Sequence, residues 1–265
     1  MILKILLNSL SIKIIRKQKN ILFGNFYIIM NKNHKSFVCG IKGNYLSVKE
    51  KRFLIKYKPW GIILFSRNIK SIKQTKILTN SIKKIFKNKN YPILIDEEGG
   101  RVSRLKKFID SSIFTAKYFG NLYKSNNKKF DIYYNVYVKQ ISYLLRLLGV
   151  NINSVPVLDI RRKKSHNVIG DRSYSSDKKI VSKIGDICIE KFHKNRIGTI
   201  IKHIPGHGLA KSDSHKKLPI INQKIEYLIK NDFQTFKKKK SLIAMTGHLL
   251  FKNIDSSETT THSKK

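Results

Sequence analysis

From residue 37 onward, two kinds of hydrophobic pattern follow each other along the chain. Short, continuous apolar runs are typical of parallel strands buried on both faces, and one example is WGIILF at 60–65. Other segments carry apolar residues at helical spacing, for example Leu78, Ile82 and Ile85. The pattern predicts strands over 37–40, 60–65, 91–95, 150–158, 199–203 and 241–245.

Helices are expected between these strands, and polar residues mark where several of them begin. Ser47 and Glu50 have the spacing of a capping box, in which the two side chains accept hydrogen bonds from backbone N–H groups at a helix start. Further helices are predicted after Ser71, over 130–148, after the N-cap Asp177 and over 225–236. Strands that alternate with helices indicate βα units around a parallel sheet.

The chain has 265 residues, close to the roughly 250 residues of a single α/β barrel domain. A closed barrel needs eight strands, whereas the pattern provides six before the polar tail at 256–265. The domain itself is expected over 37–255, and residues 1–36 are interpreted as an N-terminal extension. Met30 is an alternative start of the protein.

The extension contains two apolar runs, at 1–15 and 21–30, separated by the basic stretch 16–19. Neither run reaches the ~20 apolar residues of a membrane span. No alanine precedes Ala116, which disfavours a signal peptide with a small-residue cleavage site. No membrane association is therefore expected, although a helix lying on a membrane surface is the alternative.

The chain is strongly basic, with 55 Lys and Arg against 16 Asp and Glu and a formal net charge of +39. Such a charge raises the question of nucleic-acid binding. However, the lysines are spread over the whole chain, and abundant Ile and Asn suggest an AT-rich coding sequence. We expect no specific nucleic-acid partner. The two cysteines, Cys39 and Cys188, lie far apart in apolar contexts and are predicted to be buried free thiols in a reducing compartment.

Polar residues gather where the predicted strands end, which is where α/β barrels carry their chemistry. The run 96–101 follows the third strand, Asp159 the fourth, and His248 the sixth. Each cluster taken alone is equally compatible with a structural salt bridge. Their common position at one rim favours a functional site.

The densest cluster is KHIPGHG at 202–208, followed by the triplet DSH at 213–215. Three His and one Asp in this stretch are able to ligate zinc. The glycines and the separation of the triplet make an acid/base role more natural, because the pKa of an unperturbed His, near 6.5, suits proton transfer at neutral pH. No metal and no cofactor are expected.

Five motifs follow one another along the chain: IDEEGGRVSRL, PVLDI, IGDRSYSSD, KHIPGHG with its downstream DSH, and TGHLLF. Their types and order resemble those of the cytosolic bacterial β-N-acetylglucosaminidases (β-N-acetylhexosaminidases) of glycoside hydrolase family 3. The resemblance extends from residue 37 to about 255. It implies a TIM-type (β/α)8 barrel, here incomplete with about six βα units. It also implies cytoplasmic hydrolysis of terminal β-linked N-acetylglucosamine from muropeptide fragments in peptidoglycan recycling.

The resemblance also implies roles for individual residues. It assigns binding of the sugar to Asp96, Arg104, Arg172, Lys202 and His203. It assigns the acid/base role of a retaining mechanism to His215, assisted by Asp213.

One part of the family pattern is missing. A retaining mechanism needs a carboxylate nucleophile, which the family carries in an SDD-like motif at the end of the seventh strand. No such motif follows Met245, and Asp255 lies where the family has a loop. Three explanations stay open: the N-terminal piece of a broken gene, one chain of a split enzyme completed by a second chain, or a non-catalytic sugar-binding protein. In the first and third cases we expect a monomer.

Overall fold

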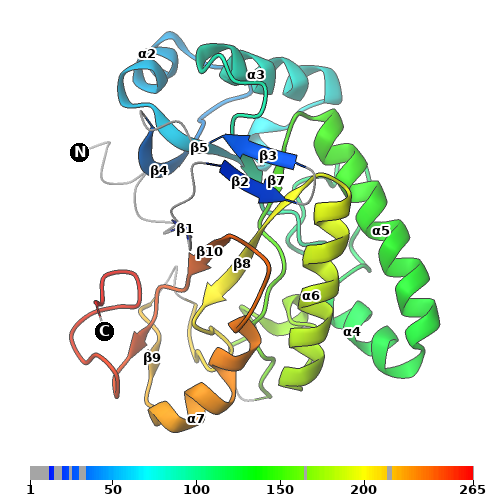
Figure 1. The fold of residues 1–265 in the computed structure, drawn as a ribbon, viewed down its shortest axis with the longest axis vertical. Coiled ribbons are helices and arrows are strands. Elements are labelled where there is room, and N and C mark those ends of the chain that lie inside the picture. Colours follow the sequence, from blue (N-terminus) through cyan, green and yellow to red (C-terminus); the bar gives the residue numbers. More distant parts are fainter. Residues whose placement is uncertain are drawn as a thin grey trace.

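The chain, described by a computed structural model, is built around one seven-stranded sheet (Figure 1). The structure describes residues 12–14, 20–23, 26–29, 34–163, 166–213 and 217–264. From one edge to the other, the strands are β1 (Ile12–Ile14), β10 (Ile243–Thr246), β8 (Gly198–Ile204), β7 (Ile152–Asn153), β6 (Ile93–Ile95), β5 (Pro59–Leu64) and β4 (Lys35–Gly40).

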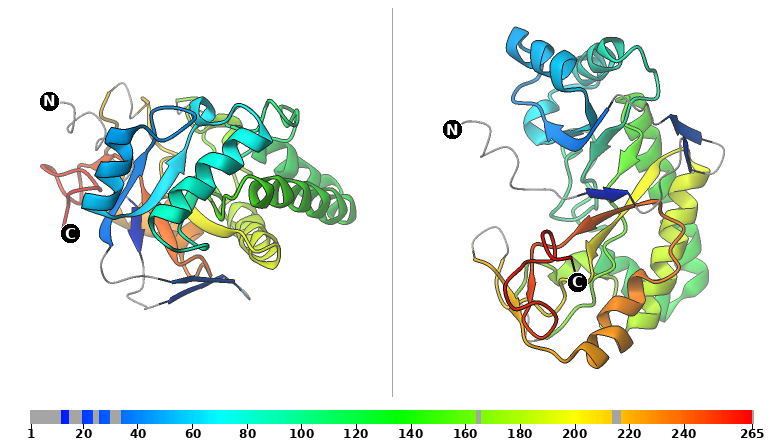
Figure 2. Two further views of the ribbon diagram at one scale, coloured as in Figure 1. Left: turned by 90° about the horizontal axis from the view of Figure 1, so that it is seen from above. Right: turned by 60° about the vertical axis from the view of Figure 1, so that its left-hand side comes forward.

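The six strands from β4 to β10 are parallel, and they lie side by side in chain order. The helices are α2 (Val48–Tyr57), α3 (Ile72–Ile85), α4 (Ala116–Ser125), α5 (Asn127–Leu147), α6 (Lys178–Lys194) and α7 (Ile225–Lys230), with short 3-10 turns at η1 (Ser66–Asn68), η2 (Gly170–Arg172) and η3 (Asp232–Phe236). The sheet curls into a half-barrel with the helices on its outer side (Figure 2). The expected incomplete α/β barrel of six parallel strands is confirmed.

Two hydrophobic clusters lie on the two faces of the curled sheet. The larger cluster packs outward-facing strand residues such as Ile62 and Leu64 against the helices, as at Leu78 and Ile184. The smaller cluster consists only of residues in or beside the strands, among them Trp60. Strands buried on both faces explain why their sequences read as continuous apolar runs.

Several predicted helix starts are confirmed by their capping geometry. The Ser47 hydroxyl accepts from the N–H of Glu50 at 3.2 Å, and the Glu50 carboxylate accepts from the N–H of Ser47 at 2.8 Å. The Asp177 carboxylate accepts from the N–H of Lys179 at 2.7 Å. These acceptors satisfy N–H groups that have no partner inside the helix.

The strand predicted over 150–158 is wrong in its length, since β7 contains only Ile152–Asn153. Pro156 has no N–H group to donate to a neighbouring strand. Beyond it, the chain meets β8 again through Leu158, whose N–H donates to the Lys202 carbonyl at 2.8 Å. This second contact brings the residue after Leu158 next to the end of β8.

Other elements were not predicted from the sequence. Helix α4 begins after the N-cap Thr115, and the strands β9 (Ile220–Ile221) and β11 (Leu250–Phe251) pair with each other in a separate sheet. The residues expected to form a polar tail fold back, since the Thr260 N–H donates to the Leu249 carbonyl at 2.8 Å.

The described parts of the N-terminal extension are strands rather than a helix. Strand β2 (Asn20–Phe23) forms a hairpin with β3 (Phe26–Ile29), and β1 pairs antiparallel with β10. Among the described residues, no helix combines the length and apolar character that crossing a bilayer requires.

Both cysteines are free thiols. Cys188 is buried in the larger cluster, as predicted, and burial raises the pKa of its thiol to about 11. Cys39 is only partly buried, and burial raises its pKa to about 12. At neutral pH neither cysteine is a reactive thiolate.

Candidate active site

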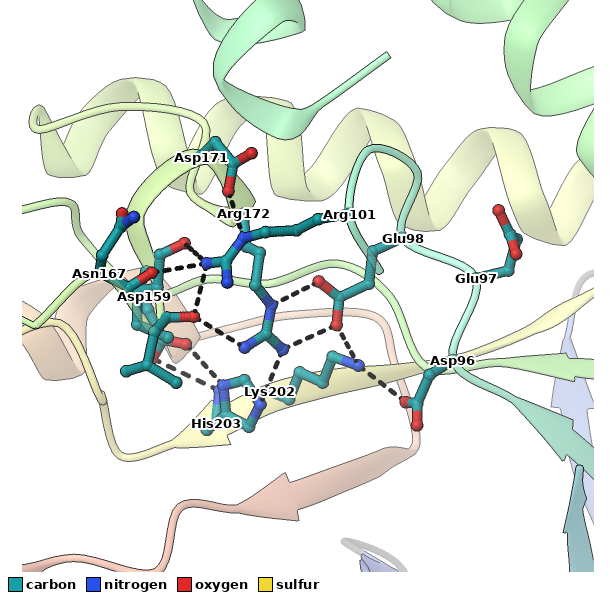
Figure 3. A network of polar contacts seen from close by, with 12 residues as sticks. Asp96, Glu97, Glu98, Arg101, Asp159, Asn167, Asp171, Arg172, Lys202 and His203 are labelled. Carbon is teal, nitrogen blue, oxygen red and sulfur yellow. Dashed lines mark hydrogen bonds and ion pairs between the residues drawn. The ribbon is translucent and has the colours of Figure 1, made fainter. Parts of the chain in front are cut away.

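Charged side chains from three neighbouring strand ends meet at one rim of the half-barrel (Figure 3). Asp96 follows β6, Asp159 follows the extended segment after β7, and Lys202 and His203 belong to the end of β8. Arg172 reaches the same place from η2. Because the carboxyl ends of parallel strands share one edge, residues more than 100 positions apart become neighbours.

Lys202 is the innermost cation of the site, and its side chain is only 2% exposed. Its Nζ lies 2.9 Å from Oδ1 of Asp96 and 2.7 Å from Oε1 of Glu98. A buried ammonium is stable only when it is paired, since burial removes its hydration. The predicted residues Asp96 and Lys202 are therefore brought together, and Glu98 joins them.

Glu98 also binds Arg172 through two parallel hydrogen bonds. Nε of Arg172 donates to Oε2 at 2.7 Å, and Nη2 donates to Oε1 at 2.8 Å. This two-point geometry fixes the plane of the guanidinium as well as its position. Nη2 also lies 3.5 Å from Nε2 of His203, so Arg172 connects the carboxylate side of the site to the histidine.

The cations keep these carboxyl groups ionised. Burial alone raises the pKa of Asp96, but the charge of Lys202 and its hydrogen bond outweigh burial, and the net pKa lies below the ordinary value. Burial also acts to raise the pKa of Glu98, but the charges and hydrogen bonds of Arg172 and Lys202 outweigh burial, so the net pKa lies below the ordinary value. Burial opposes the charged form of Arg172 too, but Glu98 more than compensates and raises its pKa.

Asp159 orients His203. Its carboxylate is fully buried, and Oδ2 lies 2.7 Å from Nδ1 of His203. Oδ1 accepts from the N–H of His207 at 2.6 Å, which holds the loop after β8 in place. Burial raises the pKa of Asp159, but His203 lowers it below the ordinary value. With Nδ1 facing this carboxylate, Nε2 of His203 faces Arg172.

Two further arginines border the site. Nη2 of Arg104 lies 3.9 Å from Oδ2 of Asp96, so this predicted residue also joins the network. Arg101 holds the loop that carries Arg172, because its guanidinium donates to Asp171 at 2.7 Å and to the Asn167 carbonyl at 2.6 Å.

The five residues predicted to bind a sugar thus lie together, while the predicted acid/base pair is only partly described. His215 lies outside the described residues. Asp213 is described, and its backbone carbonyl accepts from the N–H of Lys217 at 2.9 Å. Asp255 accepts hydrogen bonds from Ser257 and Ser263 within its own loop. Within the described ranges, no three His, Cys, Asp or Glu residues are grouped as a metal ion would require.

Sequence reasoning assigned no role to Glu98 or Asp159. Both had a visible signal, since Glu98 belongs to the acidic run after β6 and Asp159 ends the next extended segment. Their partners are 74 and 44 residues away in the sequence, and no local pattern reveals contacts over such separations.

The chain matches a protein-family model and is similar in sequence to named bacterial proteins. Residues 39–265 match the model of the glycosyl hydrolase family 3 N terminal domain. The chain is 31% identical over 218 residues to a beta-hexosaminidase of Hydrogenovibrio crunogenus, covering 79% of this chain and 59% of the relative. It is 30% identical over 223 residues to a beta-hexosaminidase of Tolumonas auensis, covering 81% of this chain and 63% of the relative.

The fold has a close counterpart among solved structures. The crystal structure of NagZ from Neisseria gonorrhoeae in complex with N-trifluoroacetyl-D-glucosamine superimposes with a TM-score of 0.76 at 25% identity. The match covers 86% of this chain and 67% of that one. The chain spans about 60% of the length of the two beta-hexosaminidases that it matches.

Proposed function

Because the chain belongs to the family of glycosyl hydrolase family 3 N-terminal domains, we propose that its site binds a terminal β-linked N-acetylglucosamine residue for hydrolysis. The observation that carries this proposal is the network of Asp96, Lys202, Glu98, Arg172 and His203 at one rim. The similar beta-hexosaminidases, and the N-trifluoroacetyl-D-glucosamine held by NagZ, support the sugar class.

The chemistry of the network suits sugar hydroxyl groups, each of which donates one hydrogen bond and accepts others. The Arg104, Arg172 and Lys202 side chains supply donors, and the Asp96 carboxylate supplies acceptors. Since the network fixes these groups before a ligand arrives, little side-chain freedom is lost on binding. His203 is held by Asp159 with Nε2 directed toward the same side as Arg172.

The proposed reaction is retaining hydrolysis in which His215 protonates the leaving oxygen and later activates water, with Asp213 supporting its charged form. The nucleophile is proposed to be a carboxylate of the SDD type, supplied together with further βα units to this half-barrel. No cofactor takes part in this scheme. The substrate class is proposed to be muropeptide fragments, hydrolysed in the cytoplasm during peptidoglycan recycling.

The alternative is a sugar-binding protein without hydrolytic activity, which uses the same network but performs no chemistry. Hydrolysis of a chromogenic N-acetylglucosaminide separates the two. A rate near that of a full-length relative would exclude the binding-only alternative. Recovery of hydrolysis on adding a second polypeptide with the SDD segment would establish a split enzyme.

Binding itself is tested by titrating the chain with N-acetylglucosamine and following chemical shifts. Lys202→Met removes the ammonium that Asp96 and Glu98 share, and we expect the affinity to fall by about tenfold or more. Lys239→Met is the matched control, because this lysine is 3% exposed and pairs with Asp186 at 2.9 Å on α6. Failure of the unsubstituted chain to bind the sugar would refute the proposed function.

A further inference from the structure

The three consecutive acidic residues after β6, at 96–98, do not all point in the same direction. Asp96 and Glu98 point to Lys202, whereas Glu97 is turned away from the network (Figure 3). The alternation follows from an extended backbone, in which successive side chains point to opposite sides. Glu97 is 1% exposed, and a Glu side chain is rarely buried this deeply unless it is paired.

The loop after Glu97 turns back and passes over its side chain. Gly99 and Gly100 form the turn with φ angles of 85° and 57°, a region that favours glycine. The Glu98 N–H then donates to the Val102 carbonyl at 2.9 Å, which closes the turn. The returning residues consequently lie above the Glu97 carboxylate.

One oxygen of Glu97 receives three hydrogen bonds from this returning segment. Oε2 accepts from the N–H of Arg104 at 2.6 Å, from the N–H of Leu105 at 3.1 Å and from the Ser103 hydroxyl at 3.0 Å. The backbone of Arg104 is thereby fixed at its own nitrogen. From this anchored position its guanidinium reaches to 3.9 Å from Asp96.

We propose that Glu97 is a positioning residue, which sets the Arg104 guanidinium beside Asp96 so that the two groups bind one sugar hydroxyl. The identity of the ligand rests on the proposed function, whereas the link from Glu97 to Arg104 rests on the hydrogen bonds themselves. Glu97 does not touch the ligand in this arrangement.

The surroundings of Glu97 make this link sensitive to pH. Burial raises the pKa of Glu97 to about 7, while its hydrogen bonds from Ser103, Arg104 and Leu105 and the charge of Arg104 oppose the rise. Tyr137 faces it from α5, and within the described ranges neither its hydroxyl nor Oε1 of Glu97 has a hydrogen-bond partner. A proton on Oε1 leaves Oε2 able to accept, but as a weaker, uncharged acceptor.

The test is a double-mutant comparison of affinity for N-acetylglucosamine. Glu97→Ala and Arg104→Ala should each lower the affinity by roughly tenfold, and the double variant should be no weaker than Arg104→Ala alone. Glu97→Gln keeps an acceptor oxygen and should bind within about threefold of the unsubstituted chain. Its affinity should also lack the decline between pH 8 and 6 that Glu97 is expected to cause. Losses that multiply in the double variant, or a Glu97→Ala variant that binds normally, would overturn the proposal.

Two measurements keep the inference separate from the proposed function and from misfolding. If the chain binds no N-acetylglucosamine, the proposed function fails, but nuclear relaxation of the Arg104 side chain still reports its order without a ligand. We expect that order to fall strongly in Glu97→Ala and only slightly in Glu97→Gln, whose amide oxygen is an uncharged acceptor; an unchanged order in Glu97→Ala would refute positioning. If Glu97→Ala does not fold, the same relaxation is followed against pH in the unsubstituted chain and in Glu97→Gln. The order of Arg104 should then fall near pH 7 in the unsubstituted chain, toward the level of Glu97→Gln, whose own order should not change with pH. Identical profiles in the two proteins would refute positioning.

Discussion

At the scale of single residues, the site depends on balanced buried charges. Lys202 and Arg172 are both held by Glu98, and Asp96 adds a second carboxylate to Lys202. Removing one member of such a network leaves a charge without compensation in a region from which water is largely excluded. The stability of the site and its affinity for a ligand are therefore coupled through the same few side chains.

Glu98→Gln should lower the free energy of unfolding by about 3 kcal/mol at neutral pH, because Lys202 and Arg172 lose their shared anion. Urea denaturation followed by circular dichroism measures the change. The folded pKa of Glu98 lies below its unfolded value of 4.5, so its stabilisation is present above that pH. The difference between the two proteins should shrink as the pH falls below 4.5.

Glu190→Gln is the matched control for this substitution. Glu190 pairs with Lys194 at 2.6 Å on an exposed part of α6. Exposed pairs of this kind contribute less than about 1 kcal/mol. A loss in Glu98→Gln no larger than that in Glu190→Gln would show that the buried network adds no stability.

At the scale of elements, short polar contacts determine how helices join strands. In the last turn of α6, Nε2 of His193 lies 2.9 Å from the Thr199 hydroxyl at the start of β8. The same hydroxyl lies 3.2 Å from the Ser241 hydroxyl, just before β10. These contacts connect α6 and the neighbouring strands β8 and β10 at the end of the half-barrel opposite to the site.

His193 should make the protein less stable in mild acid. Burial lowers its folded pKa to about 4 from an unfolded value of 6.5. As the pH falls from 7 to 5, the unfolded chain gains a proton that the folded chain does not, and about 2 kcal/mol of stability is lost. His193→Gln should therefore lose less stability over this range in urea titrations. His248→Gln, which changes an exposed histidine, serves as the control, and equal losses in both variants would contradict the assignment.

At the scale of the whole molecule, β10 is the last of the six parallel strands, and one of its edges has no parallel neighbour. Strand β1 takes this place in an antiparallel arrangement, opposite in direction to the six parallel strands. An uncovered edge exposes unpaired N–H and C=O groups and invites pairing with other chains. In the proposed complete enzyme, further βα units would have to take the position of β1.

A chain that begins at His34 lacks β1 and should exchange the amide hydrogens of 243–246 faster than the full chain. Those of the central strand β6, at 93–95, should be unchanged, because β6 keeps both neighbours. Hydrogen-exchange mass spectrometry gives both rates. Equal protection of 243–246 in the two chains would show that β1 does not cover this edge.

The order of strands, most helices and the positions of the polar clusters could be predicted from sequence. They depend on local periodicity, which records whether each residue faces the core or the solvent. Helix α4 and the pair β9–β11 were not predicted. The two strands have two residues each, too few to show a period. Helix α4 does carry a signal in the sequence, since Tyr118, Phe119 and Leu122 stand at helical spacing. The length of β7 was wrong, because Pro156 ends its ladder while the chain remains extended and meets β8 again.

The sequence by itself determined that the chain forms βα units with charged residues at one rim, and its motifs indicated the family. Only the tertiary structure decided that Glu98 joins Lys202 to Arg172, that Asp159 holds His203, and that Glu97 turns away toward Arg104. It also decided that β1 covers β10. The physical reason is shared: charge pairing and strand-edge pairing depend on which groups become neighbours after the sheet curls, and local periodicity carries no information about partners that are distant along the chain.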